Sequence, residues 1–250
     1  MLKIGIIGGS GLDDSDLLKD FQILDVHNHW GHPSSVLKTG KVHDVDVVML
    51  SRHGSTHSIS PSGVNYRANI WALKDLGVTH IIATTACGSL REDIQRGDMV
   101  ILDQMIDFTR HRQVTFFDNF IDGAVHTQMA DPFNSLIRRK MIECCKDLNI
   151  KHHEKATVIT IEGPRFSTRA ESFMFRQWGA DVINMSTGPE CILANEANIP
   201  YGCIAISTDY DCWKTDEEPV TFDEILKIFN QNIEKVKELI VGTIDKMKIL

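Results

Sequence analysis

The chain has 250 residues, of which 42 % are hydrophobic and 24 % are charged, and its net charge is −8. It is long enough to bury a substantial core, and its composition is that of a globular protein. The acidic balance and the lack of a basic stripe argue against nucleic acid as a partner. No apolar run reaches the ~18 residues of a membrane span, and the first residues do not resemble an export signal, so we expect a cytoplasmic protein.

Short apolar runs alternate with amphipathic segments along the whole chain. The predicted strands are Lys3–Ile7, Val45–Ser51, His80–Thr84, Met99–Asp103, Ala156–Ile161, Val182–Met185 and Tyr201–Ser207. The predicted helices are Val64–Leu76, Asn134–Leu148, Arg169–Trp178 and Pro189–Ala197. Several strands are apolar throughout, as in a sheet that is covered on both faces. The alternation predicts an α/β fold, which we expect to form a single domain over residues 1–250.

The last segment gives the clearest helix prediction. Thr221 and Glu224 have the spacing of a capping box. Apolar residues then recur at steps of three and four, which is typical of a helix with one buried face. They are Phe222, Ile225, Leu226, Phe229, Ile233, Val236, Ile240 and Ile244.

Glycines surround Ser10 directly after the predicted strand Lys3–Ile7. Such a turn lets backbone N–H groups approach an anion, and the Ser10 hydroxyl adds a donor. A dinucleotide-binding turn is one alternative, with Asp25 in the place of its ribose-binding acid. Its glycine spacing fails, however, because no third glycine follows and Asp13 and Asp14 would face the pyrophosphate. A plain tight turn is the other alternative.

Donor-rich motifs occur near three other predicted strand ends. Arg52 has a planar guanidinium that matches a phosphate, and His53 can donate as well. Thr85 and Ala86 stand among small residues whose backbone donors can reach a ligand. Ser186 lies just ahead of a predicted helix, whose free N–H groups favour an anion. Each motif alone could be a surface pair, a turn or a cap. Together, the three strand ends with Ser10, Arg52 and Thr85 predict one shared anion site at the carboxyl ends of the strands.

Two further motifs offer side chains that could contact a ligand. A Gly-Pro turn after the strand Ala156–Ile161 presents Phe166, whose flat ring could stack on a base. Asp209 and Asp211 follow the strand Tyr201–Ser207, and carboxylates are costly to bury unless they are used. A core phenylalanine and solvated loop acids are the respective alternatives.

Metal and redox chemistry have little support in the sequence. The six cysteines have no CxxC pair and no zinc spacing, so reduced and mostly buried thiols are expected. Two histidine groups lack a suitably spaced acidic or thiol partner for a metal. They are His27, His29 and His32, and His152 with His153. The short basic clusters Arg110–Arg112 and Arg138–Lys140 are expected on solvated faces.

Long segments of the chain, taken in order, carry a family resemblance. The most specific are SRHG, VNYRANIWAL, TTACGSLRE, TIEGPRFSTRAESFMFRQWGADVINMS and STDYDCWK. Together they resemble the 5′-methylthioadenosine phosphorylase branch of the trimeric purine nucleoside phosphorylase family. The resemblance implies an α/β fold with a central mixed, partly barrel-like sheet flanked by helices, and it implies a homotrimer.

The resemblance also implies which residues bind phosphate and the purine. The phosphate residues would be Ser10, Arg52, His53, Thr85, Ala86 and Ser186. The family commonly has threonine where the two serines stand, and both replacements keep the hydroxyl. Met185 would lie under the ribose and Phe166 against the purine. Asp209 and Asp211 would face the N6 and N7 edge of the base.

The 5′-methylthio group would rest on Phe222, Ile225 and Leu226 at the start of the last helix. The family often has smaller residues such as valine there, so Phe222 bears on the size of this part of the pocket. His126 would come from the neighbouring subunit.

The implied reaction is the phosphorolysis of S-methyl-5′-thioadenosine to adenine and 5-methylthio-α-D-ribose 1-phosphate, a step of purine and methionine salvage. Its catalytic residues would be Asp209, Ser186 and His53, with Asp209 protonated so that it can donate to N7 of the base. Phosphate is the co-substrate, and no metal or organic cofactor is implied. The alternatives are a general purine or methylthioinosine phosphorylase, a nucleoside hydrolase, a nicotinamide-dependent dehydrogenase and a non-catalytic nucleotide-binding module.

Overall fold

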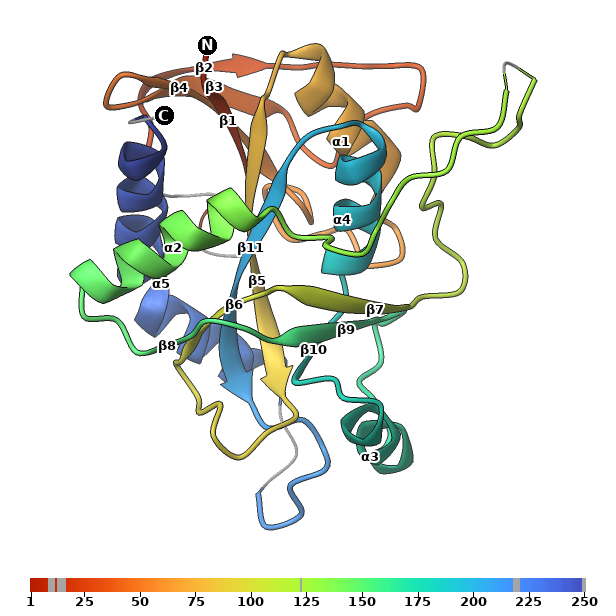
Figure 1. Ribbon diagram of the computed structural model, residues 1–250, viewed down its shortest axis with the longest axis vertical. Helices are drawn as coiled ribbons and strands as arrows, with labels where there is room; N and C mark the ends of the chain where they lie inside the picture. Colours follow the sequence, from red (N-terminus) through yellow and green to blue (C-terminus); the bar gives the residue numbers. More distant parts are fainter. Residues whose placement is uncertain (9–11, 13–16, 122, 218–220, 249–250) are drawn as a thin grey trace.

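The computed structural model describes all residues except 9–11, 13–16, 122, 218–220 and 249–250. Within the described residues the chain forms one mixed sheet of eleven strands with helices on both faces (Figure 1). The strands are β1 (Lys3–Gly8), β2 (Lys19–Leu24), β3 (Leu37–Val42), β4 (Val45–Ser51), β5 (His80–Ser89), β6 (Met99–Ile101), β7 (Gln104–Phe108), β8 (His152–His153), β9 (Thr157–Ile161), β10 (Val182–Asn184) and β11 (Tyr201–Asp209). The helices are α1 (Tyr66–Asp75), α2 (Ser135–Asp147), α3 (Arg169–Gln177), α4 (Thr187–Glu196) and α5 (Phe222–Met247).

Strand β5 is the branch point of the sheet. Its first part lies between β1 and β11, which both run parallel to it, and its end pairs with antiparallel β10 through Gly88 and Ser89. From these three neighbours the sheet continues to β4, β3 and β2, to β6 and β8, and to β9 and β7. The predicted mixed α/β sheet is therefore confirmed. The fork brings the ends of β5, β10 and β11 together.

Four of the helices cover the sheet as two pairs (Figure 1). Helices α1 and α4 lie on one face, where Ile70 and Leu193 join its buried apolar cluster. Helices α2 and α5 pack together on the other face, where Met141, Leu239 and Ile240 are buried. Because the full burial of one such side chain contributes ~1.5–3 kcal/mol, these two clusters hold the strands in place beneath the site.

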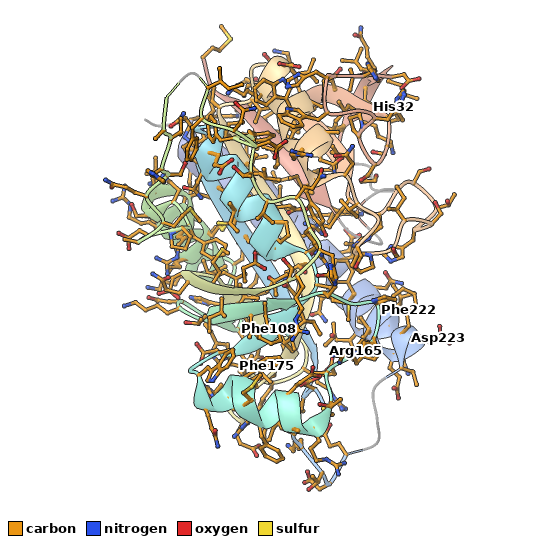
Figure 2. The ribbon with its side chains drawn as sticks, turned by 90° about the vertical axis from the view of Figure 1, so that its right-hand side faces the viewer. His32, Phe108, Arg165, Phe175, Phe222 and Asp223 are labelled. Carbon is orange, nitrogen blue, oxygen red and sulfur yellow. The ribbon has the colours of Figure 1, made fainter. Side chains whose placement is uncertain are left out.

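Helix α3 packs below the β9–β7 part of the sheet. The Phe175 ring lies edge-on to the Phe108 ring of β7, with ring centroids 5.3 Å apart (Figure 2). The helix begins at a capping box formed by Thr168 and Glu171. Among the described helices, including the long α5, none has the apolar length that crossing a bilayer requires.

Most predicted elements occur with ends shifted by one or two residues. The strand predicted at His80–Thr84 instead continues to Ser89, and the one predicted at Tyr201–Ser207 continues to Asp209. Both are longer because their pairing continues, with Gly88 bonded to β10 and opposite Asp209 of β11. The Thr-rich motif and Asp209 thus lie within strands and not after them. Strands β2, β3, β7 and β8 have no counterpart among the predicted strands.

Candidate active site

A cavity of about 190 Å³ lies where β4, β5, β10 and β11 end against the first turns of α5. Its lining includes many of the predicted site residues. They are Arg52, His53, Thr85, Ala86, Phe166, Met185, Ser186, Asp209, Asp211, Phe222, Ile225 and Leu226. We call the buried polar set Arg52, Thr85, Asn184, Ser186 and Asp209 the floor of the cavity, and the exposed rings of Phe166 and Phe222 its rim.

Of the predicted site residues that the structure describes, His126 is not in this lining. Ser10 lies outside the described residues. His126 lies in the long segment between β7 and α2, where its ring contacts Phe120 at a centroid distance of 5.6 Å. The roles of all these residues stay predictions, but the segments that carry most of them meet at one cavity.

The Arg52 side chain is only 2 % exposed and is held by fixed partners. Its Nε and Nη2 donate to the two carboxylate oxygens of Glu190, the latter at 2.9 Å, and its Nη1 donates to the Thr84 carbonyl at 2.9 Å. Burial alone would lower the pKa of Arg52, but the charge and hydrogen bonds of Glu190 outweigh it and raise that pKa. One N–H on each terminal nitrogen remains for a ligand. Arg52 is therefore held rigidly. Glu190 balances its charge, and its two remaining N–H groups can donate to a ligand.

His53 is a neutral residue in this environment. Burial, together with the charge of Arg52, lowers the pKa of His53 to about 4. Its Nδ1 lies 2.9 Å from the Ile59 carbonyl, which can only accept, so Nδ1 carries the hydrogen and Nε2 is an acceptor. In this form Nε2 has no hydrogen to donate to phosphate, and the part that His53 plays in phosphate binding stays a prediction. The ring can instead accept the hydroxyl hydrogen of hydrogen phosphate.

Ser186 and Thr85 bring hydroxyl groups to the cavity that Arg52 also lines, and we call the part of the cavity lined by these three residues its anion end. Ser186 is the N-cap of α4, yet its side chain makes no capping hydrogen bond, so its hydroxyl is not committed to the helix. The Thr85 hydroxyl accepts from Asn184 Nδ2 at 3.2 Å and donates to the Ala86 carbonyl at 2.9 Å. The first turn of α4 adds few free donors, because the Gly188 N–H donates to Thr160 Oγ1 and Pro189 has no N–H. The groups that suit an anion here are the two hydroxyls and the Arg52 N–H groups.

Asp209 is a buried carboxyl group, only 5 % exposed, and not a solvated loop acid. Burial raises its pKa, although the Asp211 N–H and the Thr208 hydroxyl, each 2.8 Å from one of its oxygens, act in the opposite direction. Gly88 leaves room for it, because a Cβ there would lie 2.9 Å from Asp209 Oδ1. Burial also raises the pKa of Asp211, which accepts the Ser167 hydroxyl at 2.6 Å. Both acids can thus hold a proton to a higher pH than usual.

Apolar side chains from three segments complete the cavity. Phe166 comes from the turn after β9, and Met185 directly follows β10. Phe222, Ile225 and Leu226 come from the first turns of α5, and Figure 2 shows Phe222 at the start of that helix. These groups suit an apolar substituent and the face of a planar ring.

Several residues of the site were not singled out from the sequence. His57 lines the cavity, with its ring centroid 4.6 Å from that of His53 and 5.5 Å from that of Phe222. Asn184 donates a hydrogen bond to Thr85, and Glu190 accepts hydrogen bonds from Arg52. The signals that could have indicated them are a second histidine close after Arg52 and a glutamate within an apolar helix.

Arg112 corrects the expectation of a solvated basic face, because its side chain is only 1 % exposed. It donates to the backbone carbonyls of Glu162 and Met185 and, at 2.9 Å, to Tyr66 Oη. The Glu162 carboxylate lies 3.1 Å from Arg112 and also accepts two backbone N–H groups. Burial would raise the pKa of Glu162, but these donors lower it to about 2. The pair fixes the backbone of Met185 at the cavity.

The histidine groups give no metal site among the described residues. No cluster of three or more His, Cys, Asp or Glu side chains there has the geometry to hold an ion. His152 Nδ1 donates to the Ile150 carbonyl at 2.8 Å, and His153 Nε2 lies 2.9 Å from an Asp98 carboxylate oxygen. All six cysteines are free, and five of them are buried.

Comparison with known proteins assigns this architecture to a family. The sequence profile of the phosphorylase superfamily matches residues 3–245. The S-methyl-5′-thioadenosine phosphorylases of Danio rerio and Xenopus tropicalis are 53 % and 54 % identical to the chain, over 98 % of its length and 89 % of theirs. The chain belongs to the phosphorylase superfamily. Within it, the chain is a relative of the S-methyl-5′-thioadenosine phosphorylases, as the resemblance predicted.

Solved structures confirm the phosphorylase fold. The methylthioadenosine phosphorylase from Schistosoma mansoni in complex with adenine is 42 % identical and has a TM-score of 0.95, covering 100 % of this chain and 93 % of that one. A variant of that enzyme in complex with methylthioadenosine is 41 % identical with a TM-score of 0.94, at the same coverage. The sheet and its helices are thus those of the nucleoside phosphorylases.

Proposed function

We propose that this phosphorylase cleaves the C1′–N9 bond of S-methyl-5′-thioadenosine with inorganic phosphate, releasing adenine and 5-methylthio-α-D-ribose 1-phosphate. One observation carries the proposal: Arg52, Asp209 and Phe222 line a single cavity. That cavity therefore offers an anion site, a buried carboxyl group and an apolar surface together. The names of its relatives support the same substrate, and with it a role in purine and methionine salvage.

Phosphate attacks the sugar from the Arg52 side of the cavity. The free N–H groups of Arg52 and the hydroxyls of Thr85 and Ser186 hold the phosphate, while His53 accepts its hydroxyl hydrogen. As the C1′–N9 bond lengthens, the sugar gains oxocarbenium character, which the phosphate charge stabilises. A phosphate oxygen then bonds to C1′, and the electron pair of the broken bond leaves with adenine.

The departing adenine receives a proton from Asp209. The raised pKa of this buried carboxyl group keeps the proton available, and its second oxygen accepts from the N6 amino group. Help of this kind is typically worth ~10²–10⁴-fold in rate. A carboxyl group favours a 6-amino purine, because a 6-oxo purine would need a donor in the place of that acceptor. This argues against inosine-type substrates.

The decisive experiment is product analysis with and without phosphate. The protein is incubated with S-methyl-5′-thioadenosine, adenosine, inosine and methylthioinosine, and the base and sugar products are identified by mass spectrometry. We expect adenine and methylthioribose 1-phosphate only when phosphate is present. Adenine release with free sugar in the absence of phosphate would instead make the protein a hydrolase. Adenosine is included because the S. mansoni relative is described as an adenosine/methylthioadenosine phosphorylase.

We also propose a homotrimer in which His126 enters the neighbouring subunit's nucleoside site. The segment that carries it extends away from the rest of the chain (Figure 1) and exposes Phe120, Ile121 and Val125. Light scattering tests the trimer. Mixing inactive His126→Ala subunits with inactive Asp209→Asn subunits tests the shared site, because activity returns only if one subunit supplies what the other lacks.

The reaction needs phosphate as co-substrate and no metal or organic cofactor, because every group that this mechanism uses is a side chain. Dialysis against a metal chelator is therefore expected to leave the rate unchanged. We further propose that the protein works in the cytoplasm, where its free cysteines stay reduced. Cell fractionation tests this location.

A further inference from the structure

A buried asparagine connects the segments that surround the anion end of the cavity. Asn184 is the last residue of β10 and is only 6 % exposed. Its Oδ1 accepts from Thr160 Oγ1 of β9 at 2.8 Å. Its Nδ2 donates to Thr85 Oγ1 of β5 at 3.2 Å and to Thr187 Oγ1 of α4. One amide group thus joins two strands and the start of a helix.

The hydrogen bonds of this network run in one direction. The Gly188 N–H can only donate, and it donates to Thr160 Oγ1 at 3.0 Å. The Thr160 hydroxyl passes its own hydrogen to Asn184 Oδ1, so the amide nitrogen faces Thr85. The Thr85 oxygen then accepts, which leaves its hydrogen free to donate away from the amide. In the described structure that hydrogen is donated to the Ala86 carbonyl at the wall of the cavity, and it turns from this carbonyl to the ligand when an anion binds.

We propose that Asn184 is a positioning residue for phosphate, which acts by making the Thr85 hydroxyl an obligate donor to the anion. This inference rests on the proposed function and deepens it at the phosphate site. Phosphate oxygens mainly accept hydrogen bonds, so a threonine hydroxyl helps to bind phosphate only when its hydrogen is available. An acceptor at position 184 would take that hydrogen away, whereas the Asn184 amide group leaves it to the ligand.

Because the network is buried, the order of donors and acceptors along its hydrogen bonds affects its energy. Thr160 and Thr187 are fully buried, so solvent cannot replace a lost partner. In such surroundings each hydrogen bond polarises the next, and an unmatched polar group is costly. The network also begins at a backbone N–H in the first turn of α4, the helix whose N-cap position Ser186 occupies. The same amide therefore aligns Thr85 with the helix start on the other side of the anion end.

The test is Asn184→Asp, which keeps the shape of the side chain and replaces the donor by an acceptor. The Thr85 hydrogen then turns to the new carboxylate. We expect the KM for phosphate to rise by about tenfold to a hundredfold, as for the loss of a hydrogen bond to a charged group. We expect the KM for S-methyl-5′-thioadenosine to change by less than about threefold, because Thr85 acts on the anion. Titration calorimetry with inorganic phosphate alone measures the same loss without turnover.

A second variant protects the test if Asn184→Asp does not fold. Thr160→Val keeps volume and removes the hydroxyl that orients the amide, so it is expected to shift phosphate binding in the same direction by a smaller factor. Thr243→Val is the matched control, since Thr243 is an equally buried threonine of α5 that does not line the cavity and whose hydroxyl donates to the Leu239 carbonyl of its own helix. It is expected to leave phosphate binding unchanged.

The outcomes separate this inference from the proposed function. Unchanged phosphate binding in a folded Asn184→Asp or Thr160→Val protein overturns the inference, and so does an equal rise of both KM values. A wild-type protein that binds phosphate normally but does not cleave the nucleoside counts against the proposed function alone. In that case the calorimetric comparison still decides the role of Asn184.

Discussion

The floor and the rim of the cavity differ in how firmly the protein holds their side chains. Arg52 and Asp209 of the floor are buried, and every hydrogen bond that fixes them comes from a neighbouring strand, helix or turn. Phe166 and Phe222 of the rim are 43 % and 49 % exposed. The floor is therefore set in place before any substrate arrives, whereas the rim can adjust to what it covers.

This difference matches the two tasks of a phosphorylase. Charge development at C1′ and N7 requires groups that do not reorganise during the reaction, and a buried, hydrogen-bonded floor supplies them. Recognition of the 5′ substituent requires only apolar area, which an exposed ring can provide. We therefore expect substitutions in the floor to have large effects on rate or stability, and substitutions in the rim to change preference among nucleosides.

The largest effect is expected for Asp209→Asn. Because the amide cannot supply the N7 proton and presents a donor to N6, kcat/KM for S-methyl-5′-thioadenosine should fall by ~10²–10⁴-fold. Activity on inosine-type substrates should fall less or rise. Steady-state kinetics on both nucleosides measure the change. Retention of the original preference would show that the base-recognition assignment is wrong.

Glu190→Gln tests whether the floor depends on its buried ion pair. The variant leaves the Arg52 charge without its partner, so the free energy of unfolding should fall by ~3–5 kcal/mol. Phosphate then becomes the counter-charge, and saturating phosphate should raise the melting temperature more in the variant than in the wild type. Asp46→Asn breaks the exposed pair with Lys41 and is the control, with an expected loss of ~0–1 kcal/mol. An equal loss of unfolding free energy in the two variants would contradict the idea that the buried ion pair matters more than the exposed one.

The titration of His53 is expected to make the free energy of unfolding depend on pH, with an effect slightly smaller than that of Glu190→Gln. The pKa of this residue is about 4 in the folded protein and 6.5 in its ordinary state, so the unfolded chain binds more protons between these values. Stability is therefore fully present above pH 6.5 and falls as the pH drops toward 4, by ~3 kcal/mol at most. Urea unfolding at pH 7 and pH 4 should show this loss in the wild type and a smaller one in His53→Gln. Identical losses would mean that His53 is not held neutral.

The sequence predicts the central strands of the sheet better than its edge strands. Strands β1, β4 and β11 are apolar runs buried on both faces, which is why their pattern is clear. Strand β2 was missed because it pairs on one side only and exposes Ile23 to 61 %, so its pattern is mixed. Strand β7 at the other edge has no fully buried residue.

The same contrast holds for the site. The residues that we expect to contact the substrate belong to recognisable motifs, and most of them line the cavity. Glu190 and Asn184 could not be assigned from the sequence, because their roles depend on which buried donors the fold brings to them. The sequence predicts a solvated face for Arg112, because its partners include backbone carbonyls and side chains distant in the sequence, which the local sequence does not reveal.

The smallest effect is expected at the rim, for Phe222→Val. The side chain is half exposed, so its truncation should change the free energy of unfolding by less than ~1 kcal/mol. The shorter side chain enlarges the apolar end of the cavity next to Ile225 and Leu226. We expect kcat/KM for S-methyl-5′-thioadenosine to change by less than about tenfold, while that for a 5′-butylthio analogue rises by about tenfold relative to it.

Phe173→Val is the matched control for this rim prediction. Phe173 lies on α3, is 44 % exposed and does not line the cavity, so its truncation removes a similar exposed ring without touching the substrate. The ratio of the two kcat/KM values should stay at the wild-type value in this control. A shift of the same size in both variants would trace the change to a general loosening of the protein. A shift confined to Phe222→Val would tie 5′ preference to the rim, because the floor is the same in both proteins.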